Sequence, residues 1–90
     1  MLKFKDVDEV IQRANSSSYG LVGSVFSNDM KVCHKVVKGR QCGQVYVNNY
    51  FQMGVDTPFG GFKDSGVGRE MSSHGLDRFL ETKTVVYDCN

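Results

Sequence analysis

Cysteine and histidine are the residue types in this chain best suited to nucleophilic catalysis or metal binding. Three cysteines (Cys33, Cys42 and Cys89) and two histidines (His34 and His74) are present. No two of them fall at the Cys-x-x-Cys or His-x-x-x-His spacings that direct a pair of ligands onto one ion. Cys33 lies on an apolar helical face, so we expect it in the core, whereas His34 points about 100° away into solvent. The sequence therefore predicts no metal site.

Cys42 is the remaining candidate nucleophile, because it stands beside Gly43 at the expected end of a helix. A reactive cysteine needs a nearby cation, histidine or helix N-terminus to favour its thiolate, and none is placed to do so. The odd number and wide spacing of the cysteines also do not suggest a disulfide framework, which fits reduced thiols inside a cell. We predict no catalytic residue within residues 1–90.

Residues 58–70, Pro-Phe-Gly-Gly-Phe-Lys-Asp-Ser-Gly-Val-Gly-Arg-Glu, form a glycine-rich loop that contains four of the ten glycines and the only proline. Glycine permits positive φ and close backbone approach, so this segment is expected to be shaped by tight turns. It is not a phosphate-binding motif: Asp64 follows Lys63 where a P-loop requires Ser or Thr, and Met71 replaces the third glycine of a dinucleotide motif. We predict a structural loop that shapes a pocket wall or an interface, and no bound cofactor. The residues expected to give the loop its shape are Pro58, Gly60, Gly61, Ser65, Gly66 and Gly68.

Charged and aromatic side chains near this loop each allow two interpretations. Arg69, Glu70 and Glu81 form either a solvated set of charges or an arginine–carboxylate pair at a subunit interface. The aromatic residues either fill a hydrophobic core or line a ligand pocket, and residue type alone favours filling. These aromatic residues are Tyr50, Phe51, Phe59 and Phe62.

The bulk composition excludes several classes of partner. A net charge of +1 with interspersed acids and bases provides no basic stripe for nucleic acid and no patch for an anionic membrane surface. No apolar run reaches the length of about 18 residues that spans a bilayer, and the N-terminus lacks the apolar region of a secretory signal. We therefore expect an intracellular protein, in the cytoplasm.

The elements that must position these residues follow from hydrophobic periodicity. Asp6 and Glu9 resemble a capping box before a helix that ends near Asn15, and a second helix, capped by Asn28, is expected from Met30 to about Gly39–Gln41. Strands are expected at 21–26 and 44–48, with a strand remnant at 2–5. The fold class is therefore α/β, an incomplete β-α-β-α-β piece with a parallel sheet of at least three strands. The glycine-rich loop, a helix within 68–80 and a β-prone segment at 82–88 follow.

Two helices of this length hardly cover both faces of such a sheet, so the chain looks incomplete. The β-prone C-terminal segment would leave an unpaired edge, which favours pairing with another chain or with missing sequence.

Four segments, taken in order and spacing, resemble the C-terminal end of the NAD(P)-dependent aldehyde dehydrogenase superfamily. They are Tyr19-Gly-Leu, Gly43-Gln-Val-Tyr-Val-Asn-Asn-Tyr, the glycine-rich loop and Glu81-Thr-Lys-Thr-Val. The resemblance covers nearly all 90 residues, whereas family subunits are several times longer. It implies that the catalytic cysteine, the glutamate base, the oxyanion asparagine and the domain binding NAD or NADP have no counterpart here.

The resemblance also implies roles for residues at matching positions. Phe59 matches the aromatic residue of the Pro-Phe-Gly-Gly motif, which contributes to the aldehyde channel, and Asn49, Phe51 and Met53 match variable positions of that channel. The family pairs the residues matching Arg69 and Glu81 near the subunit interface, and its terminal strand joins a sheet across subunits. That strand matches residues 82–90, of which Thr82, Lys83, Thr84, Val85 and Val86 are the predicted contacts, and 1–81 match the catalytic domain.

The chain departs from the family at two positions. Cys42 stands where alanine is usual, and Gly39 interrupts a helix that the family continues, which costs about 1 kcal/mol relative to alanine.

The expected function is that of a C-terminal segment of an aldehyde dehydrogenase, a truncated product or an excised fragment that is inactive alone. The alternatives are a module that associates with full-length aldehyde dehydrogenase subunits and a nonfunctional remnant.

Overall fold

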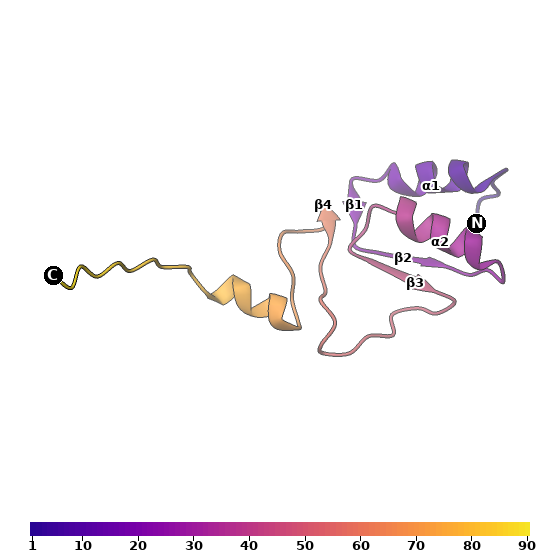
Figure 1. The fold of residues 1–90 in the computed structure, drawn as a ribbon. Coiled ribbons are helices and arrows are strands. Elements are labelled where there is room, and N and C mark those ends of the chain that lie inside the picture. The colour runs from indigo at the N-terminus through magenta and orange to yellow at the C-terminus, as the bar shows by residue number, and fades with distance from the viewer.

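The computed structural model describes residues 1–90, and it is an elongated chain with a small α/β body at one end (Figure 1). Its radius of gyration is 18.5 Å, whereas a compact domain of this length has about 12 Å. Only seven residues are buried. The elements in order are α1 (Val7–Asn15), β1 (Tyr19–Gly20), β2 (Val22–Val25), α2 (Met30–Gly39), β3 (Gln44–Val47), β4 (Phe62–Lys63) and the 3₁₀-helix η1 (Ser73–Phe79).

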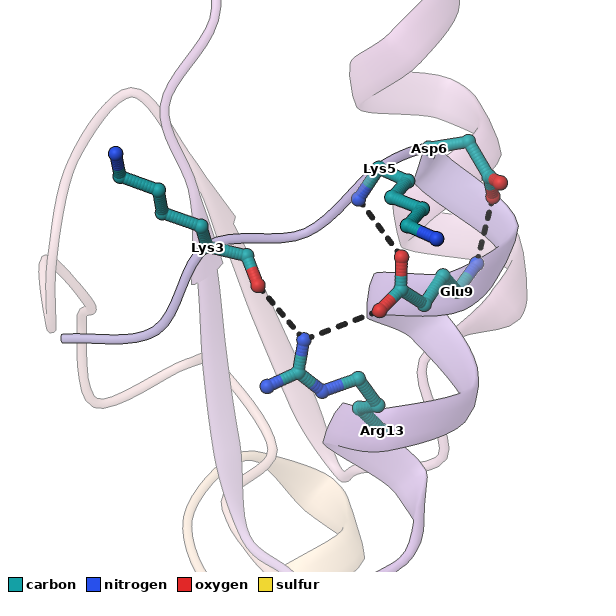
Figure 2. A network of polar contacts seen from close by, with 5 residues as sticks. All are labelled: Lys3, Lys5, Asp6, Glu9 and Arg13. Atoms are coloured by element: carbon teal, nitrogen blue, oxygen red, sulfur yellow. Dashed lines mark hydrogen bonds and ion pairs between the residues drawn. The ribbon is translucent and has the colours of Figure 1, made fainter.

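The predicted start of α1 is confirmed, and Figure 2 shows why the residues before it are not a strand. Asp6 caps the helix by accepting from the Glu9 amide at 2.8 Å. The Glu9 carboxylate accepts from the Lys5 amide at 2.7 Å, and Arg13 Nη1 donates to the Lys3 carbonyl at 2.8 Å. The prediction of a strand remnant at 2–5 is therefore wrong, because side chains of α1 take backbone groups that a neighbouring strand would need.

A β-α-β unit forms the centre of the body. β2 and β3 are parallel and in register from Val22 opposite Gln44 to Val25 opposite Val47, and α2 connects them. The helix α2 is capped by Asp29, which accepts from the Lys31 amide at 2.8 Å, and not by Asn28 as predicted. Asn28 lies one residue too early, because a cap side chain reaches the amides two and three positions beyond it.

The buried residues lie where α2 meets the sheet. Cys33, as predicted, is fully buried on α2, and Val36 and Tyr46 are also buried. Helix α1 packs beside α2, and a side chain at Gly39 would approach within 2.8 Å of an Ile11 methyl group. The glycine that interrupts the helical pattern therefore makes room for α1.

The remaining strands form a second, smaller sheet. β1 pairs with β4 in antiparallel orientation, with Tyr19 opposite Lys63 and Gly20 opposite Phe62. The predicted sheet of at least three parallel strands is therefore wrong: the parallel sheet has two strands, and 19–20 pair with the glycine-rich loop. Between residues 49 and 67, β4 is the only regular element.

Three glycine backbones meet where the two sheets adjoin. The Gly43 amide donates to the Gly20 carbonyl at 3.0 Å. A Cβ atom at Gly43 would overlap the carbonyl oxygen of Gly60, and one at Gly20 would overlap the Gln41 carbonyl. The start of β3 therefore contacts the glycine-rich loop directly, and no larger residue fits there.

The C-terminal part extends away from the body (Figure 1). The predicted helix within 68–80 is the short 3₁₀-helix η1, and residues 81–90 are exposed and form no strand. A strand needs a partner for its backbone groups, and this chain provides none to residues 82–88. The helices of the structure are too short to cross a membrane.

Hydrogen exchange on the purified chain will separate the body from the C-terminal segment. The amides of Gln44 and Asn48 donate to the carbonyls of Leu21 and Val25 at 3.1 and 2.8 Å, so they are expected to exchange more slowly than the exposed amides of 82–88. Equal exchange in both segments would contradict the fold.

Gly43→Ala will test the close approach of β3 to the loop. The added methyl group has no space, so we expect a loss of about 1 to 3 kcal/mol in the free energy of unfolding. Gly75→Ala is the matched control, because the nearest atom to a Cβ there is 3.4 Å away. Urea denaturation followed by circular dichroism measures both variants, and equal stability would show that the backbones are not in contact.

Candidate functional site

The glycine-rich loop is closed at its base by a pair of backbone hydrogen bonds. The Phe59 amide donates to the Glu70 carbonyl at 2.9 Å, and the Glu70 amide donates to the Phe59 carbonyl at 2.6 Å. Gly66 and Gly68 have φ values of +138° and +78°, which side chains rarely adopt. The loop is therefore a shaped unit whose ends lie side by side.

Contacts from the middle of the loop attach it to the body. The Gly20 amide donates to Ser65 Oγ at 2.9 Å, and the Asp64 amide donates to the Ser18 carbonyl at 3.0 Å. Lys63 Nζ donates to the carbonyls of Asn15 and Ser17 at 2.8 and 3.1 Å. The two Lys63 contacts stabilise the C-terminal end of α1, where a cation is favourable.

Arg69 holds the loop together from within. Its Nη1 donates to the carbonyls of Gly61 and Gly68 at 3.0 and 2.8 Å, and its guanidinium carbon lies 5.6 Å from the centre of the Phe62 ring. No ion pair joins Arg69 to Glu81, which is exposed. The isolated chain therefore uses Arg69 as an internal clamp, and its pairing with Glu81 at a subunit interface stays a prediction.

The basic side chains of the loop are not free to pair with the phosphates of a dinucleotide. Its two basic side chains, Lys63 and Arg69, both donate to carbonyl oxygens of the chain. Five of its amides also donate to carbonyls, namely those of Phe59, Asp64, Ser65, Gly66 and Glu70. A phosphate cradle instead needs a row of amides that point at the ligand.

Next to the loop, four aromatic rings form a cluster. Phe51 is at its centre: its ring lies 6.1 Å from that of Phe59 in an edge-to-face arrangement, 5.8 Å from that of Tyr50 and 6.3 Å from that of Tyr46. Such spacings are those of favourable aromatic pairs. The structure thus brings together three of the four predicted aromatic residues, whereas Phe62 lies with Arg69. We call Tyr46, Tyr50, Phe51 and Phe59 the aromatic cluster.

One side of the aromatic cluster is open to solvent. Tyr50 is 71% exposed and Phe51 is 48% exposed, although both contact other rings. Phe51 also has a φ of +56°, which is an outlier for a bulky residue. The cluster is therefore a wall with one packed face and one face that is uncovered in this chain.

Gln44 and Tyr46 lie behind this wall, and sequence reasoning placed them on a strand without giving them a role in the site. Tyr46 Oη donates to Gln44 Oε1 at 2.9 Å, and Gln44 Nε2 donates to the Pro58 carbonyl at 3.3 Å. Both residues are buried. The available signal was the position of a glutamine at an inward-facing site of an otherwise apolar strand, since a buried amide requires partners.

The other predicted channel residues are Met53, which contacts Gln44, and Asn49, which precedes Tyr50 in the sequence. Met53 is half-buried, and its sulfur accepts from Gln44 Nε2 at 3.8 Å. Asn49 is exposed, and its side chain makes no hydrogen bond within the chain. The neighbouring Asn48 instead ties the end of β3 to β2, because its amide group accepts from the Ser27 amide and donates to the Ser27 carbonyl.

The thiols and imidazoles are not gathered into a reactive group. Cys33 and Cys42 are buried, and their sulfurs donate to the carbonyls of Ser27 at 3.8 Å and Gln44 at 3.1 Å, while Cys89 is exposed in the C-terminal segment. No three of the cysteine, histidine and acidic side chains lie close enough to hold a metal ion. His74 contacts only Ser72, and His34 is exposed.

The predicted interface residues 82–86 are exposed along their whole length, and apolar side chains are prominent among them and their neighbour. Val85, Val86 and Tyr87 are 58%, 87% and 82% exposed. A contiguous run of exposed apolar side chains marks a contact surface or an aggregation site.

Residues 1–85 match the model of the aldehyde dehydrogenase family. Over 85 residues, the chain is 51% identical to an aldehyde dehydrogenase of Enchytraeus buchholzi and 49% identical to retinal dehydrogenase 2 of Homo sapiens. A mouse relative named aldehyde dehydrogenase, cytosolic 1 is 48% identical. These matches cover 94% of the chain but only 16–17% of each relative, so the chain spans about a sixth of their length.

Solved structures agree with these matches. An NAD⁺ complex of an aldehyde dehydrogenase from Bacillus cereus superposes with a TM-score of 0.91 at 42% identity, covering 99% of this chain and 18% of that one. An apo indole-3-acetaldehyde dehydrogenase superposes with a TM-score of 0.87 at 39% identity, covering 91% and 19%. On sequence and fold together, the chain belongs to the aldehyde dehydrogenase family.

Proposed function

We propose that the chain acts as the C-terminal part of an NAD(P)-dependent aldehyde dehydrogenase, where it supplies part of the wall of the aldehyde channel. The observation that carries this proposal is the aromatic cluster, whose rings are held together on one side and exposed on the other. A wall of this kind buries the apolar body of an aldehyde once an opposite wall is present.

Apolar aldehydes are the substrate class that such a wall favours. Covering about 100 Å² of apolar surface contributes about 2.5 kcal/mol, which is about a 70-fold gain in affinity. Aromatic rings and the Met53 thioether add specific contacts with a flat or unsaturated body. Four of the similar proteins are named retinal dehydrogenase 2, and retinal is a large, unsaturated and apolar aldehyde.

The chemical step depends on groups that this chain does not contribute. NAD or NADP, when bound to a complete enzyme, accepts the hydride of the aldehyde. The thiols of Cys33 and Cys42 are buried against carbonyls, so they are not free to attack a substrate. We therefore propose that the chain orients the aldehyde and excludes water from its apolar body, and that it has no dehydrogenase activity alone. Like its mouse relative named cytosolic, it is proposed to act in the cytoplasm.

A chimera tests the proposal. Residues 1–85 replace the matching 85 residues of the Enchytraeus buchholzi enzyme, and NADH formation is measured for the chimera and for the isolated chain. We expect aldehyde oxidation by the chimera and none by the chain. In the chimera, Phe59→Ala should raise the KM for an aromatic aldehyde by about tenfold. Phe62→Ala, in the same loop but outside the aromatic cluster, is the matched control.

Three results would contradict this function. They are turnover by the isolated chain that a cysteine substitution removes, a folded chimera without activity, and equal effects of the substitutions at Phe59 and Phe62.

A second candidate function is a module that associates with full-length aldehyde dehydrogenase subunits through residues 82–88. The exposed Val85, Val86 and Tyr87 favour it, because a β-prone run without a partner is a template for pairing with another chain.

Co-purification with the Enchytraeus buchholzi enzyme measures this association. We expect Val85→Pro to abolish it, because proline removes an amide donor from a strand, whereas Val67→Pro, in the exposed part of the loop, should leave it intact. Equal binding by both variants would place the contact elsewhere.

A further inference from the structure

Gln44 is the one buried residue of the chain with a polar side chain other than tyrosine or cysteine, and it stands at the start of β3. Its relative exposure is 9%. A buried amide is costly unless its oxygen and nitrogen both find partners. In this structure both do, since the Oε1 atom accepts from Tyr46 and the Nε2 atom donates to the Pro58 carbonyl.

These two hydrogen bonds connect Gln44 to two sides of the aromatic cluster. Tyr46 is itself a member, with its ring 6.3 Å from that of Phe51. Pro58 immediately precedes Phe59, whose ring meets the other edge of Phe51 at 6.1 Å. The Gln44 amide also contacts the sulfur of Met53 at 3.8 Å. One side chain therefore links β3, the segment that follows it and the start of the glycine-rich loop.

We propose that Gln44 is a positioning residue that holds the aromatic cluster in place and thereby sets the preference for bulky apolar aldehydes. This inference rests on the proposed role of the aromatic cluster as a channel wall. Gln44 lies behind the rings, so it acts through Phe51 and Phe59 and does not itself contact the substrate.

The backbone of Phe51 shows why the cluster needs support. Its φ of +56° is unfavourable for a bulky residue and persists only when the surroundings enforce it. Phe51 is also 48% exposed, so packing alone does not fix its ring. Without the Gln44 contacts, the rings become mobile, and a ligand that binds them must order them first.

The free-energy cost of ordering the rings affects the binding of some substrates and not of others. A bulky aromatic aldehyde covers the rings, so its KM includes the cost of ordering them. A two-carbon aldehyde has little apolar area to place against the wall and is not affected. The rate of the chemical step is also unaffected, because Gln44 touches no reacting atom.

The test uses the chimera that carries residues 1–85, with steady-state kinetics on benzaldehyde and acetaldehyde. Gln44→Leu removes both hydrogen bonds and puts an apolar side chain of similar size in their place. We expect the KM for benzaldehyde to rise about three- to tenfold, with kcat and the KM for acetaldehyde unchanged. Gln41→Leu is the matched control, because Gln41 is exposed and its side chain makes no hydrogen bond.

Tyr46→Phe removes one of the two hydrogen bonds alone, and it serves as a milder variant if Gln44→Leu does not fold. It keeps the ring and removes only the donor to Gln44 Oε1. A rise in the KM for benzaldehyde is expected again, and the double variant should be no worse than Gln44→Leu alone, because both substitutions break the same link. Additive effects, equal changes for both aldehydes, or no change in either would overturn the proposal.

A second measurement distinguishes failure of this inference from failure of the proposed function. Nuclear Overhauser contacts between the Phe51 and Phe59 rings are recorded on the purified chain. We expect Gln44→Leu to weaken these contacts and Gln41→Leu to leave them unchanged. Loss of these contacts with an inactive chimera would mean that the positioning is correct and the channel role is wrong, whereas ring contacts that survive Gln44→Leu would overturn the inference itself.

Discussion

The packing of the glycine-rich loop on the α/β body depends on three chain segments that meet at glycine backbones. No side chain has space there. Gly43 donates to the Gly20 carbonyl and lies directly against the Gly60 carbonyl. This junction places the start of β3 under the glycine-rich loop, so the next inward-facing residue of the strand, Gln44, reaches the Pro58 carbonyl. The close approach of these backbones therefore fixes where Phe59 lies relative to the parallel sheet.

Several polar groups of the glycine-rich loop are bound by the chain itself. Arg69 bonds loop carbonyls, Lys63 bonds the end of α1, and Phe59 and Glu70 close the base. The same contacts occupy both basic side chains of the loop, which a bound phosphate would need as partners. The loop so held places Phe59 against Phe51 in the aromatic cluster.

Local patterns predicted the helices and the central strand, and pairing over long distances determined the rest. The Asp6 cap, the apolar stripes of α1 and α2 and the strand predicted at 44–48 depend on neighbouring residues and are found within about one residue, whereas the cap of α2 is Asp29 and not Asn28. The strand expected at 2–5 does not form because Glu9 and Arg13 bind its backbone groups. Pairing of Tyr19–Gly20 with Phe62–Lys63 joins segments more than forty residues apart, and no periodicity in the sequence reveals such a partner. In the site, residue type identified Phe51 and Phe59, but the link from Gln44 required coordinates.

We propose that the aromatic cluster, held from behind by β3, contacts the body of the aldehyde in a complete enzyme. A crystal structure of the chimera with benzoate, the product of benzaldehyde oxidation, tests it most directly. We expect the benzoate ring to lie against Phe51 and Phe59, with the Gln44 amide still bonded to the Pro58 carbonyl. A benzoate ring bound away from both side chains, in an otherwise intact enzyme, would contradict it.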